Sequence, residues 1–417
     1  MDEEHESSYK QQDPAPRYNG RDAAMVLASM HGAKTLLGSA TPTVDTYYKA
    51  RTGRYGLVTL TERFEGAEPP HVEIVDMSQA RRSGAATGAF ARTTRRLVAE
   101  AIGRGEQAIL FLNRRGYAPV ARCRMCAYIP KCTHCDVSLT YHRHAGKLVC
   151  HYCGATYPLP EICPACKEPS IETVGYGTER IEEELSVAFP GGKIARMDLD
   201  TTRNKDGYEQ IIESFSRGYT NILVGTQMVT KGLDFDRVSV VGVINADAVI
   251  NFPDFRSTER AFSMIEQVAG RAGRRNTRGV VSVQTSQPGH PVFPFIAAHD
   301  YGAFYEYAID ERRKYAYPPF TRLIYIYIKH PDIDSVVNLS TAYASRLRTL
   351  LGNRVFGPEE PAVARIQSLY IRKIMLKIET EASMAKVRAL LRGLYEEMHI
   401  HNPAMRRAVV YYDVDPM

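Results

Sequence analysis

All eight cysteines of the chain lie between residues 123 and 166. They form four Cys-x-x-Cys pairs: Cys123 and Cys126, Cys132 and Cys135, Cys150 and Cys153, and Cys163 and Cys166. A Cys-x-x-Cys turn lets two thiolates converge on one ion, and two such turns complete a tetrahedral Zn²⁺ site. Four turns therefore predict two four-thiolate zinc sites, and the spacing alone allows either nested or sequential pairing of the turns.

Disulfide bonds and a redox pair are the alternatives for these cysteines. Disulfides are typical of short secreted chains, whereas this chain has 417 residues, no secretory signal and all its cysteines in one segment. A redox Cys-x-x-Cys occurs once, in a β-α-β setting. Zinc is the better explanation of four repeated pairs.

A second group of candidate catalytic residues lies at the start of the chain. There, Asp2-Glu3-Glu4-His5 resembles motif II of superfamily 2 helicases. In that motif Asp2 would hold the Mg²⁺ that bridges nucleotide phosphates, and Glu3 would orient the attacking water. A charged terminal tail is the alternative. Ser39-Ala40-Thr41-Pro42, after an expected short strand at 35–37, resembles motif III and favours the helicase interpretation. His5, Ser39 and Thr41 would then couple the nucleotide site to the DNA site.

Two further stretches resemble helicase motifs V and VI. The first has glycine-flanked hydroxyl and amide residues that let backbone N–H groups approach DNA phosphates: Gly225, Thr226, Gln227, Lys231 and Gly232. The second is Gln267-x-x-Gly-Arg271-x-Gly-Arg274. Two arginines three apart in a helix lie one turn apart, so both can reach a γ-phosphate as arginine fingers. A solvated basic helix end is the alternative.

The elements that must position these residues alternate between strands and helices. Expected strands of the middle region are 72–76, 108–112, 193–198, 221–224, 238–244 and 280–284. Their alternation with helices predicts the parallel sheet of a RecA-like α/β lobe.

The last part of the chain follows another pattern. We expect a strand at 323–328, a helix at 333–351, strands at 362–369 and 371–379, a helix at 382–397 and a strand at 407–413. This β-α-β-β-α-β order predicts a ferredoxin-like α+β domain. Tyr325 and Tyr327 are better explained as half-buried sheet residues than as base-stacking residues.

Composition sets broad limits. Hydrophobic residues make up 44% of the chain and charged residues 24%, which is ordinary for globular proteins. The formal net charge of +6 permits nucleic-acid binding without arguing for it. No apolar run approaches twenty residues, so no membrane span is expected, and the cysteine usage fits a reducing cytoplasm.

Taken together, these motifs resemble the PriA family of bacterial replication-restart helicases. The resemblance also includes the Phe-Leu-Asn-Arg-Arg-Gly-Tyr stretch at 111–117 and Pro-Asp-Phe-Arg-Ser-Thr-Glu-Arg at 253–260. It implies an ATP- and Mg²⁺-dependent 3′-to-5′ DNA helicase that recognises stalled forks and D-loops and helps to load the replicative helicase. It further implies binding to single-stranded DNA, to single-stranded-DNA-binding protein and to other primosome proteins, with no membrane partner, in the nucleoid-associated cytoplasm.

The resemblance also implies a zinc arrangement and a domain plan. One ion would be held by the outer pairs, Cys123, Cys126, Cys163 and Cys166, and the other by the inner pairs, Cys132, Cys135, Cys150 and Cys153. The expected plan is a remnant of helicase lobe 1 at 1–60, lobe 2 at 61–122 and 167–288, a zinc insertion at 123–166 and a C-terminal α+β domain at 289–417.

The sequence departs from the family at its start. It begins at motif II, and no Gly-x-x-x-x-Gly-Lys-[Ser/Thr] phosphate loop occurs in it. We therefore expect a chain cut inside a domain and inactive as an ATPase alone. A non-catalytic, zinc-bearing DNA- or primosome-binding remnant is the second interpretation. A zinc-ribbon component of transcription or repair is a third, and it leaves motif VI unexplained.

Overall fold

The structure is a computed structural model of the chain. It describes all residues except 63–65, 67, 113–119, 124, 126–127, 129, 131, 134–138, 143–145, 150–154, 170, 175–177, 190–191, 198–204, 227–234, 253, 274–277 and 362. The chain divides into two compact units, each treated by itself below. Unit 1 contains Met1–Tyr55, Val120–Val174 and Ile309–Met417, and unit 2 contains Gly56–Pro119 and Gly175–Ala308.

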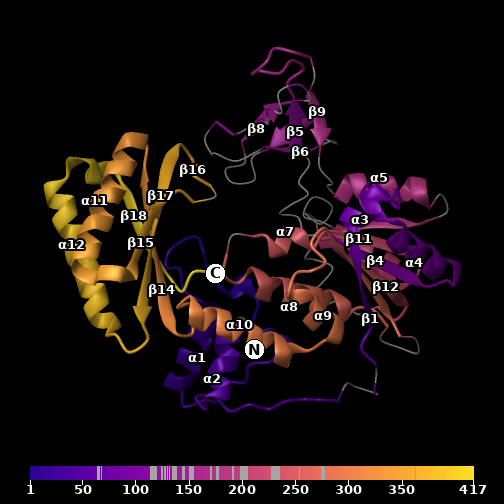
Figure 1. The fold of residues 1–417 in the computed structure, drawn as a ribbon, viewed down its shortest axis with the longest axis horizontal. Helices are drawn as coiled ribbons and strands as arrows, with labels where there is room; N and C mark the ends of the chain where they lie inside the picture. The colour runs from indigo at the N-terminus through magenta and orange to yellow at the C-terminus, as the bar shows by residue number, and fades with distance from the viewer. Residues whose placement is uncertain are drawn as a thin grey trace. The chain divides into compact units, whose positions relative to one another are not determined.

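Unit 2 is built on a six-stranded parallel sheet with the strand order β1-β13-β12-β4-β11-β10 (Figure 1). The three central strands β12, β4 and β11 are buried along their whole length, as expected of parallel strands covered on both faces. The elements of this unit are β1 (His71–Asp76), α3 (Met77–Arg82), β2 (Ala86–Thr87), β3 (Phe90–Ala91), α4 (Arg92–Gly103), β4 (Gln107–Phe111), α5 (Thr178–Ala188), β10 (Ile194–Met197), α6 (Lys205–Ser216), β11 (Ile222–Gly225), β12 (Val238–Val243), α7 (Asp247–Ile250), α8 (Ser257–Ala269), β13 (Val280–Thr285), α9 (Val292–Ala298) and the start of α10 (Tyr301–Lys314).

Helices cover both faces of this sheet, which confirms the predicted RecA-like α/β fold. On one face Val98 of α4 and Leu185 of α5 pack with Leu110 and Val224, and α8 and α9 lie on the other face (Figure 1). Phe111 and Gly225 are partners in the β4–β11 register. The loops that follow these two strands therefore leave the sheet at the same edge.

The cysteine-rich segment forms a five-stranded antiparallel sheet with the order β8-β7-β6-β5-β9. Its strands are β5 (Val120–Cys123), β6 (Thr140–His142), β7 (Lys147–Val149), β8 (Thr156–Pro158) and β9 (Ile171–Val174). Among the described residues of this module, one hydrophobic cluster is formed by Ala121, Cys132, Leu139 and Leu148. Because β5 pairs with β9, the described module extends from Val120 to Val174, beyond the 123–166 expected from the cysteines.

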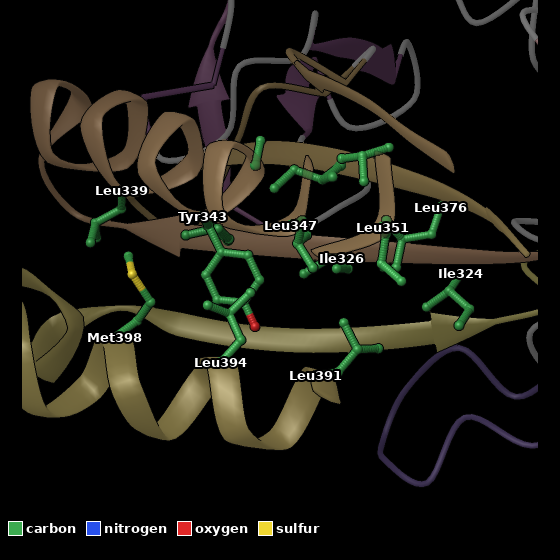
Figure 2. Packing of buried hydrophobic residues seen from close by; sticks show 14 of the residues in the cluster. Ile324, Ile326, Leu339, Tyr343, Leu347, Leu351, Leu376, Leu391, Leu394 and Met398 are labelled. Carbon is green, nitrogen blue, oxygen red and sulfur yellow. The ribbon is translucent and has the colours of Figure 1, made fainter. Parts of the chain in front are cut away.

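The C-terminal domain is an antiparallel sheet with the order β15-β17-β14-β18, and β16 pairs with β17. Both long helices contribute to one core with this sheet: Tyr343 of α11 and Leu394 of α12 point toward one another, and Ile326 of β14 lies in the same cluster (Figure 2). The elements are β14 (Thr321–His330), α11 (Ile333–Leu351), η6 (Gly352–Arg354), β15 (Val355–Glu359), β16 (Arg365–Ile366), β17 (Leu369–Glu379), α12 (Met384–His401), η7 (Pro403–Arg407) and β18 (Val409–Val414). The strand order confirms the ferredoxin-like plait.

One strand of this domain was placed wrongly from the sequence. The second strand runs from Val355 to Glu359 rather than over 362–369, where only the two-residue β16 forms. Gly357 and Pro358 lie inside β15, and both residue types normally signal a break in a strand. The register with β17 shifts between Phe356 and Glu359, which shows that the strand accommodates them by an irregularity.

The sheet face opposite to these helices carries tyrosines. Tyr325 and Tyr327 are half-buried, as predicted. Tyr327 stacks on Tyr411 with ring centroids 4.8 Å apart, and the Arg17 guanidinium lies 4.1 Å from the centroid of the Tyr411 ring. Burial raises the pKa of Tyr411 to about 12. These rings are thus already in contact with protein groups of unit 1.

The N-terminal segment of unit 1 comprises η1 (Ser7–Tyr9), α1 (Gly20–Met30) and α2 (Val44–Arg51). The expected strand at 35–37 is not formed. Instead the backbone of Gly38 donates to Met1 and accepts from Glu4, so the two stretches lie side by side. The expected domain boundaries stay predictions, and α9 lies in unit 2.

Candidate metal centre and candidate nucleotide-coupling residues

Three cysteine sulfurs of the module converge on one point. The Sγ atoms of Cys123, Cys163 and Cys166 all lie within 4.8 Å of one another. Cys123 stands at the end of β5, and its N–H donates to the Tyr128 carbonyl oxygen at 2.8 Å. The Cys163 N–H donates to the Glu168 carbonyl oxygen at 2.8 Å. These turns hold both sulfurs, and Cys123 and Cys163 are fully buried.

The sulfur distances fit a metal better than a disulfide. Cys123 Sγ and Cys166 Sγ are 3.5 Å apart, whereas a disulfide requires about 2.05 Å. Four thiolates at about 2.3 Å from one Zn²⁺ leave a separation of this order between neighbouring sulfurs. Cys126, the fourth predicted ligand of this group, lies outside the described residues. The described part of the outer set therefore has the donors and the spacing that zinc requires.

Of the inner set, Cys132 is described, and Cys135, Cys150 and Cys153 lie outside the described residues. Cys132 is 5% exposed. Its Sγ lies 3.3 Å from the hydroxyl oxygen of Tyr157, a contact that the cysteine spacing did not predict.

The residues of motifs II and III are brought together in unit 1. The His5 Nδ1 atom lies 2.7 Å from Ser39 Oγ, which in turn accepts from the Thr41 N–H at 3.0 Å. The Glu3 carboxylate lies 3.4 Å from the same imidazole nitrogen. Asp2 is exposed, and its Oδ1 accepts from the Glu3 N–H at 3.0 Å. His5 therefore lies between the Glu3 carboxylate and the Ser39 hydroxyl.

Glu4 is a member of this group that the sequence reasoning missed. Its side chain is 1% exposed and lies 2.7 Å from the Arg21 guanidinium. It also accepts from the Thr43 N–H and from the Thr46 hydroxyl. Burial opposes the charge of Arg21, but the carboxylates of Asp22 and Glu4 outweigh it, so the pKa of Arg21 lies above its ordinary value. Thr43 is the N-cap of α2 and was the available signal, because N–H groups at a helix start have no partner within the helix and can donate to a carboxylate.

The motif V and VI residues lie in unit 2. Gly225 ends β11, and the Thr226 N–H donates to the Met197 carbonyl oxygen at 3.4 Å. Gln227, Lys231 and Gly232 lie outside the described residues.

The helix that carries motif VI is shorter than the expected position of Arg271 requires. Gln267 lies in α8, but that helix ends at Ala269 and Gly270 is its C-cap. Arg271 therefore follows the helix in a turn, and the expectation that two arginines occupy successive turns of one helix is wrong. Gly273 has φ of +70°, which favours glycine and redirects the chain. Arg274 lies outside the described residues.

Sequence comparisons match three parts of the chain to known families. Residues 132–158 match the PriA DNA helicase Cys-rich region domain, residues 170–276 the helicase conserved C-terminal domain, and residues 313–417 the primosomal protein N C-terminal domain. The first match begins at Cys132 and encloses the inner cysteine pairs.

Whole-chain relatives agree with these matches. The replication restart protein PriA of Bacillus subtilis is 39% identical over 100% of this chain and 51% of its own length. The Treponema pallidum protein of the same name is 36% identical over 100% of this chain and 62% of its own length. The chain spans about half the length of the curated relatives it matches.

Similar solved structures include RecG bound to a three-way DNA junction, with a TM-score of 0.37 and 16% identity over 66% of this chain and 27% of that one. Yeast Dbp5 bound to RNA and ADP BeF3 has a TM-score of 0.36 and 11% identity over 72% of this chain and 60% of that one. Likeness at this level does not bear on function. No helix of the described residues is long and apolar enough to cross a membrane.

Proposed function

The chain belongs to the family of the replication restart protein PriA, as its C-terminal region, and from this premise we propose that it forms the C-terminal half of an ATP-dependent 3′-to-5′ DNA helicase. The helicase would recognise stalled forks and D-loops and initiate primosome assembly. The contact between His5 Nδ1 and Ser39 Oγ at 2.7 Å carries this proposal. This contact supports the proposal, because coupling between the nucleotide and DNA sites would need a link between the stretch that contains His5 and the stretch that contains Ser39.

In the proposed reaction each residue has a defined task. Asp2 would hold the Mg²⁺ of the nucleotide and Glu3 would orient the attacking water, since a carboxylate can serve either purpose. Arg271 and Arg274 neutralise charge on the γ-phosphoryl group in the transition state, and Gln267 positions them from α8. Gly225, Thr226, Gln227, Lys231 and Gly232 would contact the DNA backbone, and Gly225 stands at the carboxyl end of β11.

We further propose two structural zinc ions in the module. The clustered sulfurs of Cys123, Cys163 and Cys166 support the outer set, completed by Cys126. The family match over residues 132–158 supports an inner set of Cys132, Cys135, Cys150 and Cys153. Four thiolates leave no open coordination position, so zinc here supplies folding energy rather than catalysis. The module would present a rigid platform to DNA, single-stranded-DNA-binding protein and other primosome proteins.

A second candidate concerns the polypeptide on its own. The absence of Gly-x-x-x-x-Gly-Lys-[Ser/Thr] from the 417 residues favours a non-catalytic DNA- or primosome-binding role unless the phosphate loop is supplied with it. ATP turnover on forked DNA separates the two cases. Turnover by the purified 417-residue chain would contradict the need for a supplied loop.

The role of Arg271 can be tested in the chain joined to the N-terminal half of its family. Arg271→Ala should lower ATP turnover by about 10³-fold, the size of an arginine-finger effect, while DNA affinity is retained. Arg278→Ala is the matched control, because this exposed arginine lies beyond motif VI. Normal turnover with lost DNA binding would place Arg271 on the DNA rather than on the nucleotide.

A further inference from the structure

We propose that the Tyr157 hydroxyl donates a hydrogen bond to the zinc-binding thiolate of Cys132 and so acts as a positioning residue of the metal centre. The inference rests on the proposed function only in taking Cys132 as a zinc ligand. It holds for nested and for sequential pairing of the cysteine turns, because Cys132 is a ligand in both.

The contact arises from the strand pairing of the module. Tyr157 lies in β8, opposite Leu148 of β7, and Tyr141 of β6 lies opposite the same leucine on its other side. The Tyr157 hydroxyl oxygen is 3.3 Å from Cys132 Sγ, 3.1 Å from the Thr133 backbone nitrogen and 2.9 Å from Thr133 Oγ1. Three polar groups therefore surround one phenol oxygen beside a buried sulfur.

The number of protons that each group can donate determines the direction of each hydrogen bond. A phenol has one proton to donate and lone pairs with which to accept. The Thr133 N–H can only donate, so the phenol oxygen accepts from it. A metal-bound Cys132 is a thiolate and has no proton, so it can only accept. All three contacts are satisfied at once only if Thr133 Oγ1 donates to the phenol and the phenol donates to Cys132.

This donor matters because Cys132 is buried. A thiolate that is 5% exposed has lost most of its hydration, and a charge removed from water is costly unless hydrogen bonds replace the solvent. A hydrogen bond to an ionised group is stronger than one between neutral groups. Tyr157 therefore favours the metal-bound thiolate over the protonated thiol that forms when the metal leaves, and outer-shell partners of this kind hold ligands in place.

The test uses the 417-residue chain purified with its zinc. We expect Tyr157→Phe to release zinc about 10-fold faster to a chromogenic chelator, the lower end of outer-shell effects. Tyr141→Phe is the matched control, since it removes the same atom from a tyrosine of the same core cluster and, among the described residues, its hydroxyl bonds to no cysteine. In the cobalt-substituted protein, Tyr157→Phe should move the thiolate-to-metal charge-transfer band to longer wavelength, a change that loosened packing alone would not produce.

A second variant tests the direction of the hydrogen bonds. Thr133→Val removes the hydroxyl that orients the phenol, so we expect zinc release between the wild-type and Tyr157→Phe rates. Slower zinc release than from the wild type would show that the Tyr157 hydroxyl normally donates its hydrogen bond to Thr133 Oγ1 rather than to Cys132. That result would overturn the inference. Unchanged release and an unchanged cobalt band in Tyr157→Phe would also overturn it, with two zinc ions still present in the wild type. A wild-type chain without zinc would instead refute the proposed metal centre itself.

Discussion

At the scale of single residues, the buried carboxylate of Glu4 has a structural role that the sequence motif does not indicate. The motif directs attention to Asp2 and Glu3, yet Glu4 is the acidic side chain that is buried, and it joins three segments through Arg21, Thr43 and Thr46. The sequence pattern could identify the motif but not its interior partner, because Arg21 and Thr43 are brought to Glu4 only by tertiary folding.

Removal of this carboxylate should be strongly destabilising. Glu4→Ala removes the buried carboxylate shared by Arg21, Thr43 and Thr46. Asp22 remains beside Arg21 at 3.0 Å, so we expect a loss of about 2 kcal/mol, below the roughly 3–5 kcal/mol of a buried charge left with no partner. Hydrogen exchange of the α2 amides as a function of urea would measure the loss. Asp13→Ala is the control, because the Asp13 side chain is 89% exposed and an exposed ion pair contributes less than about 1 kcal/mol. Equal losses of stability in the two variants would contradict a structural role for the buried Glu4 carboxylate.

At the scale of elements, a polar network fastens helix α4 to the sheet of unit 2. The Gln284 side chain is fully buried in β13, accepts from the Ala91 N–H at 2.9 Å and from the Thr94 hydroxyl at 2.8 Å, and donates to the Ala89 carbonyl oxygen at 2.7 Å. Every polar atom of this amide thus has a partner. The strand itself was predictable from its apolar pattern, whereas this buried glutamine was not, because its partners come from residues about 190 positions away in the chain.

Replacing this amide should destabilise unit 2 as a whole. Gln284→Met keeps the volume but leaves the Ala91 N–H and the Ala89 carbonyl without a partner, and each buried unsatisfied group costs about 1–3 kcal/mol. Urea titration should therefore show a loss of roughly 3 kcal/mol. Gln79→Met on the exposed side of α3 should change stability by less than about 0.5 kcal/mol. A neutral Gln284→Met would show that water replaces the lost partners.

The zinc module is an element whose stability should depend on metal. Among the described residues of the module, its hydrophobic cluster has four buried side chains, and Cys123 and Cys163 are buried as well. Small domains with little apolar core usually need a metal or disulfides to fold. We expect removal of zinc by a mercurial and a chelator to abolish hydrogen-exchange protection in β5 to β9 and to leave the central strands of unit 2 protected. Persistent protection of β6 and β7 in the metal-free chain would contradict this dependence.

At the scale of the whole molecule, residues from both ends of the chain fold together in unit 1. The Lys10 ammonium is 3% exposed, lies 2.9 Å from the Asp413 carboxylate and donates to the Val414 carbonyl oxygen at 2.7 Å. The fold class and the ferredoxin-like order of the last domain followed from the sequence. The Lys10–Asp413 pair did not, because no local pattern links residues about 400 positions apart.

This pair should couple the N-terminal segment to the last strand. Asp413→Ala leaves the Lys10 ammonium buried, and we expect a loss of about 3 kcal/mol that appears as increased exchange in both η1 and β18. The double variant with Lys10→Met should recover much of that loss, because no buried charge remains. Additive effects of the two changes would show that Lys10 and Asp413 do not interact.

The most direct test of the proposed helicase is strand displacement by this chain joined to the N-terminal half of its family and loaded with zinc. Two partial duplexes, one with a 3′ single-stranded tail and one with a 5′ tail, are incubated with and without ATP. We predict that the duplex with the 3′ tail is unwound in the presence of ATP, because an enzyme that moves 3′ to 5′ can load on that tail. The Arg271→Ala variant should unwind neither duplex. Unwinding of the 5′-tailed duplex alone, or equal unwinding without ATP, would contradict the proposed function.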